Sequence, residues 1–146
     1  MSDKTSLTLL PGLLCHDALW AHQVKTLADI AHMTVADMTR DDTVGAMADR
    51  VLAAAPLKFS LAGLSMGGYV ALEIMRRAPG RVERLALLDT SANADAPETK
   101  KQRRGFIAQL DLGGFQGVTG KLLPLLIHKD RLGDDALYSA GPIVAD

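Results

Sequence analysis

Residues 58–68 read KFSLAGLSMGG, and the character of the chain changes at Ser65. The mostly apolar stretch Lys58–Gly63 before it is typical of a buried strand. The stretch after it has apolar side chains at helical spacing and ends before Pro79 and Gly80. The sequence therefore predicts a tight turn from a strand into a helix, with Ser65 at the corner.

Glycines lie on both sides of Ser65 at a spacing that suits such a turn. Gly63 and Gly67 are two positions before and after it, where side chains would collide across the turn. A serine held in this strained backbone projects its hydroxyl away from the chain, and the N-terminal amides of the following helix favour negative charge nearby. The pattern indicates a nucleophilic serine. The alternatives are a turn that only packs closely or one that binds a phosphate, and the sequence has no G-x-G-x-x-G or Walker-type motif.

On either side of this turn, strands and helices alternate along the first 94 residues. Further strands are predicted at Leu7–Leu10, Met33–Asp37 and Val82–Asp89, and further helices over His16–Ala31 and from Val44 to Ala55. Four strands that alternate with three helices predict an α/β fold, in which a parallel sheet has helices on both faces.

A second turn, LLPGLL at residues 9–14, follows the first predicted strand. Attack on an ester produces an oxyanion, which two preorganised backbone N–H groups can stabilise. We expect one from Met66, directly after the nucleophile, and one from Leu13, because Gly12 lets this loop approach closely. The alternative for residues 9–14 is a plain turn that ends a strand.

Together these motifs resemble a known family. LPGLLCHDALW at residues 10–20, followed by GLSMGG at residues 63–68, is similar to the small α/β-hydrolases, which include esterases and enol-lactone hydrolases. The ending Leu88–Ser91 of the fourth predicted strand also resembles this family. The resemblance implies the strand order 2-1-3-4 and assigns residues 1–94 to the N-terminal part of the hydrolase core.

Members of this family complete their site with an acid and a histidine, in the chain order Ser, Asp or Glu, His. Ser65, Asp89 and His128 have this order, and Asp89 lies at a strand end. The other interpretation of His128 is a surface histidine near the end of a lid helix. Many members have a histidine where this chain has Pro11, a change that leaves the backbone donor in place. The acid-bearing strand and histidine loop of the family are not found after residue 94, so we expect a truncated chain that is poorly active alone.

Residues 95–146 are expected to form a helical lid or cap segment that is itself truncated. Asp95–Arg104 is polar and is predicted as a loop that leads into an exposed helix, with the basic run Lys100–Arg104 on its solvated face. Lys121–Ile127 is apolar and is predicted to be helical.

The composition limits the classes of partner and cofactor. The net charge of −1 gives no reason to expect nucleic acid or an anionic membrane. The chain lacks a signal-peptide pattern and a membrane-spanning apolar segment, so a cytoplasmic location is expected. The single Cys15 allows no intramolecular disulfide. His16 is expected to line a pocket or begin a helix, and no metal or other cofactor is predicted because the histidines are scattered.

Three functions remain open from the sequence. The first is a serine hydrolase of carboxylic esters, lactones or thioesters, which acts on a small acyl substrate through an acyl-Ser65 intermediate. The second is a non-catalytic module that binds a small ligand. The third is a half-domain completed by another chain or a second copy, since the fourth strand would be an unprotected sheet edge that favours self-association.

Overall fold

The computed structural model describes residues 4–111 and 127–134. The chain forms two compact units, Met1–Ala92 and Asn93–Asp146. The first unit contains the sheet, and the second contains helix α4 (Pro97–Asp111) and a single helical turn, η3 (Lys129–Arg131).

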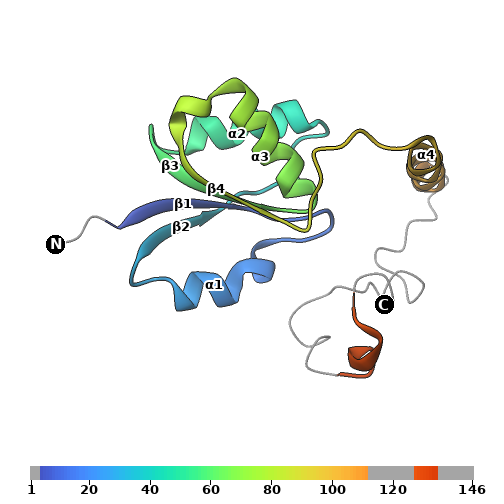
Figure 1. The fold of residues 1–146 in the computed structure, drawn as a ribbon, viewed down its shortest axis with the longest axis horizontal. Coiled ribbons are helices and arrows are strands. Elements are labelled where there is room, and N and C mark those ends of the chain that lie inside the picture. Colours follow the sequence, from blue (N-terminus) through green and yellow to red (C-terminus); the bar gives the residue numbers. More distant parts are fainter. Residues whose placement is uncertain (1–3, 112–126, 135–146) are drawn as a thin grey trace. The chain divides into compact units, whose positions relative to one another are not determined.

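Four parallel strands form the sheet of the first unit (Figure 1). They are β1 (Thr5–Leu10), β2 (Ala31–Val35), β3 (Phe59–Leu64) and β4 (Val82–Leu88). Their order is β2-β1-β3-β4, so the strand order implied by the family resemblance is confirmed. Because all four strands run the same way, the loops that follow β1, β3 and β4 meet at one edge of the sheet.

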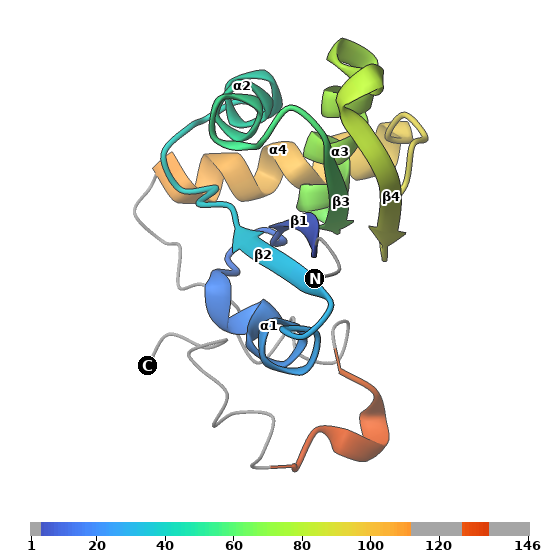
Figure 2. The same cartoon turned by 90° about the vertical axis from the view of Figure 1, so that its left-hand side faces the viewer.

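Helices cover both faces of the sheet, as the alternating pattern predicts. Short α1 (Ala21–Thr26) lies on one face, whereas α2 (Val44–Ala54) and α3 (Met66–Arg77) lie together on the other (Figures 1 and 2). Thr43 caps α2 by accepting a hydrogen bond from the Ala46 N–H. Double coverage explains why β3 is buried along almost its whole length and is apolar except for Ser60.

The core lies mainly between the sheet and the α2–α3 pair. Phe59 and Leu61 of β3 pack there with Val70 and Ile74 of α3, and all four side chains are fully buried. A smaller cluster under α1 is formed by Leu9, Trp20 and Ala62. In contrast, β4 exposes its residues from Glu83 to Leu88, and it is a sheet edge within the described residues.

The predicted helix over His16–Ala31 is wrong in its extent. The structure has a 3-10 turn at Asp17–Trp20 and then α1, which ends at Thr26. The chain turns back after α1, where the N–H groups of Ile30 and Ala31 both donate to the Leu27 carbonyl. Ala31 then begins β2 opposite Thr5, two residues before the predicted start of that strand, because sheet pairing outweighs the helical pattern.

The predicted loop at Asp95–Arg104 that leads into an exposed helix is confirmed, with the helix, α4, beginning already at Pro97. Proline suits the first position of a helix, where its missing N–H has no intrahelical partner. The basic residues Lys100–Arg104 are exposed on α4, as expected. The predicted helix Lys121–Ile127 lies outside the described residues except for Ile127.

Candidate active site

Ser65 lies at the corner between β3 and α3, with φ 51° and ψ −114°. A positive φ is strained for any residue with a side chain, and such strain is typical of functional sites. The corner has the conformation that the sequence predicts for a nucleophile. The Ser65 hydroxyl has no hydrogen-bond partner among residues 4–111 and 127–134.

The two flanking glycines are required by close backbone contacts. A Cβ atom on Gly63 would overlap the Gly67 carbonyl and lie 2.9 Å from the Gly68 nitrogen, which is the collision across the turn that the sequence predicts. A Cβ atom on Gly67 would instead overlap the Leu10 carbonyl at the end of β1. Gly67 therefore lets α3 begin directly against the neighbouring strand.

The backbone of Ser65 is tied to the end of β4. Its N–H donates to the Leu88 carbonyl at 3.0 Å. Its carbonyl accepts from the Thr90 hydroxyl at 2.8 Å and from the Gly68 N–H at 2.9 Å. No motif in the sequence predicts a role for Thr90, although a hydroxyl residue just after a strand that ends beside Ser65 is a usable signal.

The loop after β1 lies against the same corner. A Cβ atom on Gly12 would be 3.5 Å from the Ser65 Cβ, so Gly12 brings the loop into contact with the corner at Ser65. The loop is a tight turn in which the Cys15 N–H donates to the Gly12 carbonyl at 3.1 Å. This bond does not use the Leu13 N–H.

Met66 is the first residue of α3, so its N–H has no intrahelical acceptor. The structure therefore brings Ser65, Met66 and the turn that contains Leu13 to one place. The three non-glycine residues with positive φ in the described part of the chain are Leu14, Ser65 and Asp89. Each follows one of three adjacent strands, so the backbone strain is concentrated at the carboxyl ends of these strands. Parallel sheets bind ligands at this end.

Asp89 directly follows Leu88, the residue whose carbonyl holds the Ser65 N–H, and its side chain is exposed. His128 belongs to the second unit. Its exposed ring caps the η3 turn by accepting from the Asp130 N–H at 3.4 Å. The structure thus brings Asp89 to the end of the sheet that carries Ser65.

His16 begins the first helical turn after β1, one of the two roles expected for it. Its Nδ1 lies 3.3 Å from the Ala18 nitrogen and 2.8 Å from the Asp17 carboxylate, and a hydrogen bond from Nδ1 to this carboxylate lowers the pKa of Asp17. Cys15 is only half-buried, and burial raises the pKa of its thiol. Among the residues that the structure describes, no cluster of three or more His, Cys, Asp or Glu side chains could hold a metal ion.

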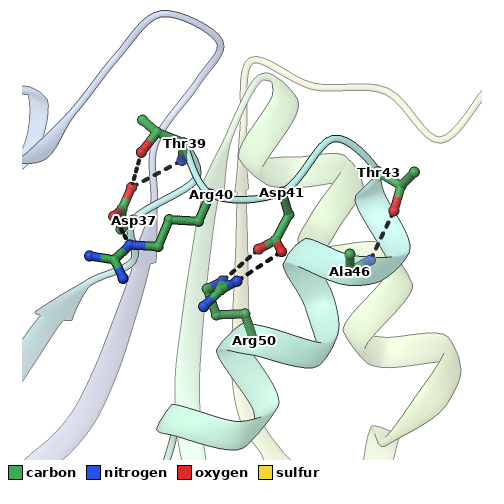
Figure 3. Close-up of polar contacts among 7 residues, drawn as sticks. All are labelled: Asp37, Thr39, Arg40, Asp41, Thr43, Ala46 and Arg50. Carbon is green, nitrogen blue, oxygen red and sulfur yellow. Dashed lines mark hydrogen bonds and ion pairs between the residues drawn. The ribbon is translucent and has the colours of Figure 1, made fainter.

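A polar cluster follows β2 (Figure 3). Its Asp37, Arg40 and Arg50 line a cavity of about 270 Å³. The Asp37 carboxylate accepts two hydrogen bonds from Thr39 and one from Arg40, which lower its pKa to about 2. Arg50 of α2 makes a two-pronged contact with Asp41, at 2.6 and 2.9 Å. Since both arginines are already paired, the cluster fixes the loop between β2 and α2.

None of the helices that the structure describes is both long and apolar enough to cross a membrane. This result is limited to the described residues.

The fold is similar to solved hydrolase structures. A thermophilic esterase from Thermogutta terrifontis is 25% identical, covers 93% of this chain and has a TM-score of 0.72. A hydrolase from Pseudomonas aeruginosa PA01 is 21% identical, covers 99% and has a TM-score of 0.66. An extracellular alpha/beta-hydrolase from a Paenibacillus species is 19% identical, covers 94% and has a TM-score of 0.62. No protein-family model and no curated protein matches the chain.

The chain has the fold of the α/β-hydrolase superfamily. It spans 56%, 60% and 66% of the lengths of these three structures, respectively.

Proposed function

We propose that this chain carries the nucleophile and the oxyanion-binding loop of a serine hydrolase for carboxylic esters, lactones or thioesters. The observation that carries the proposal is the strained corner at Ser65, with the Gly12 loop packed against it. The similarity to a thermophilic esterase supports ester-type substrates.

In the proposed reaction, the Ser65 oxygen attacks the acyl carbon and loses its proton to a base. The carbonyl electrons move onto the acyl oxygen, which is stabilised by the N–H groups of Leu13 and Met66. The intermediate then collapses, and the alcohol or thiol leaves with the proton. Water hydrolyses the acyl-Ser65 ester by the same steps and regenerates the free serine.

The acid and base are proposed to be Asp89 and His128. The position of Asp89 after β4 supports its role, because it follows the residue that binds the Ser65 N–H. His128 is supported by chain order alone. If His128 does not act as the base, Ser65 is a weak nucleophile and we expect slow turnover from this chain.

A fluorophosphonate probe tests the nucleophile, with intact-mass detection. We expect one added phosphonyl group on the wild-type chain and none on Ser65→Ala. Ser60→Ala is the matched control, since Ser60 is a buried serine on β3, the strand that leads to Ser65, and its loss should leave labelling intact. Equal labelling of Ser65→Ala would remove Ser65 as the nucleophile.

Loss of labelling in His128→Ala, but not in His32→Ala, would support His128 as the base.

A half-domain completed by a second chain is the alternative that a specific observation favours. Leu85, Leu87 and Leu88 on β4 are 37%, 43% and 38% exposed, which is unusual for a strand of a parallel sheet. Self-association through β4 would cover them. Sedimentation of the wild type against Leu87→Lys tests this, because a charge at the edge should dissociate the assembly. A monomeric wild-type chain at all concentrations would count against it.

A further inference from the structure

The Ser65 carbonyl and the Met66 N–H belong to one peptide group. A peptide group is planar, so a bond that fixes its carbonyl also fixes the direction of its N–H. The Ser65 carbonyl accepts a hydrogen bond from the Thr90 hydroxyl at 2.8 Å. This hydrogen bond from Thr90 therefore also orients the Met66 N–H, which is the proposed donor to the oxyanion.

Thr90 reaches this carbonyl because Gly68 has no side chain. A Cβ atom at residue 68 would lie 2.5 Å from the Thr90 Cγ2 and 2.6 Å from its Cβ. The partly buried Thr90 side chain thus fills the space beside the first turn of α3. The neighbouring bond from the Ser65 N–H to the Leu88 carbonyl fixes the other side of Ser65 to the same strand end.

We infer that Thr90 is a positioning residue, whose hydroxyl holds the Ser65–Met66 peptide so that its N–H faces the oxyanion. Thr90 acts through this peptide and does not contact the substrate. The inference rests on the proposed function, since it needs the Met66 N–H to serve as a donor.

Two variants separate the hydroxyl from the packing of the side chain. Thr90→Val keeps the shape and the methyl beside Gly68 but loses the donor. Thr90→Ser keeps the donor and loses the methyl. We expect Thr90→Val to reduce the second-order rate of fluorophosphonate labelling about 10-fold, a fraction of the effect of deleting an oxyanion donor. Thr90→Ser should stay within about 3-fold of the wild type because its hydroxyl still fixes the peptide plane.

A second measurement, NMR chemical shifts, reports on the Ser65–Met66 peptide group directly. The carbonyl carbon of Ser65 and the amide of Met66 should shift in the NMR spectrum of Thr90→Val and return in Thr90→Ser. Wild-type labelling rates in Thr90→Val would overturn the inference. So would an equally slow Thr90→Ser, because packing would then be the cause.

Failure of the proposed function gives a different result. In that case the wild type is not labelled at Ser65, and the NMR shifts decide whether Thr90 orients the peptide. Unchanged shifts in Thr90→Val overturn the positioning role as well. Shifts that return in Thr90→Ser support it independently of the reaction.

Discussion

The carbonyl group of Leu10, at the end of β1, faces the Cα of Gly67, in the first turn of α3. A Cβ atom at residue 67 would lie 2.7 Å from the Leu10 carbonyl carbon and closer still to its oxygen. Both groups are backbone, and β1 is paired with β2 and β3 on its two sides. Neither group can therefore move away at low energetic cost. The turn from β3 into α3 consequently requires a residue without a Cβ atom at position 67.

Gly67→Ala should consequently destabilise the fold by about 3 kcal/mol, at the upper end for overpacked sites. Gly80→Ala is the matched control, because a Cβ atom there meets nothing within 4 Å. It should change the free energy of unfolding by less than about 0.5 kcal/mol. Urea denaturation of both variants checks the difference. Equal stability of the two would show that the Leu10 carbonyl does not restrict residue 67.

The turn after β1 offers a way to delete one oxyanion donor and keep the fold. Leu14, at its third position, has φ 61°, whereas Leu13 at its second position has a negative φ, as in a type II turn. Proline is favoured at the second position of this turn, so Leu13→Pro should fold normally while it lacks the N–H.

Leu13→Pro should lower the rate of fluorophosphonate labelling about 100-fold, the effect expected for loss of one oxyanion donor. Leu13→Ala keeps the N–H and should react like the wild type, because the Leu13 side chain is 66% exposed and contributes little packing. Thermal melts of both variants establish that they fold. A fast-reacting Leu13→Pro would exclude the Leu13 amide as a donor.

The parts that the sequence predicts well are those set by neighbours in the chain. The strained corner at Ser65 follows from a strand, a spaced pair of glycines and a helix within 20 residues. The α/β class follows from alternation in the same way.

The features that the sequence does not predict depend on contacts between residues far apart in the chain. The end of α1 is decided by pairing of Ala31 with Thr5 across the sheet, which a helical pattern of apolar residues does not reveal. The bond from Thr90 to Ser65 joins residues 25 positions apart. It requires the parallel register that places the ends of β3 and β4 side by side.

Arg81 is expected to contribute more to stability than the other arginines on the surface. Its guanidinium donates to the carbonyls of Leu52, Ala55 and Pro56 at 2.8–2.9 Å, and so binds the partly buried carbonyl end of α2. It also lies 5.6 Å from the centre of the Phe59 ring in the core.

Arg81→Met should therefore cost about 2–3 kcal/mol, as expected for loss of charge-assisted hydrogen bonds at partly buried carbonyls. Arg40→Met removes only an exposed pair with Asp37 and should cost less than about 1 kcal/mol. Chemical denaturation of both variants measures the difference. Equal losses would mean that water replaces the Arg81 contacts at the end of α2.

Glu73 on α3 should make stability depend on pH in the acid range. Its carboxylate accepts hydrogen bonds from Arg76 at 2.8 Å and from Arg77 at 2.6 Å, and these lower its pKa from 4.5 to about 2. A depressed pKa in the folded state means that the unfolded chain binds protons first. The stabilisation is thus complete above about pH 4.5 and is lost as the pH falls toward 2.

Glu73→Gln should accordingly flatten the plot of unfolding free energy against pH between about 4.5 and 2. Some slope should remain, because Asp37 also has a pKa lowered to about 2 and titrates over the same range. Glu83→Gln is the matched control, since Glu83 is an exposed residue of β4 with no ion-pair partner within the described residues. Urea titrations at a series of pH values measure the slopes. A Glu73→Gln slope equal to that of Glu83→Gln would show that solvent screens the two arginines from Glu73, and that the acid sensitivity of the fold originates elsewhere.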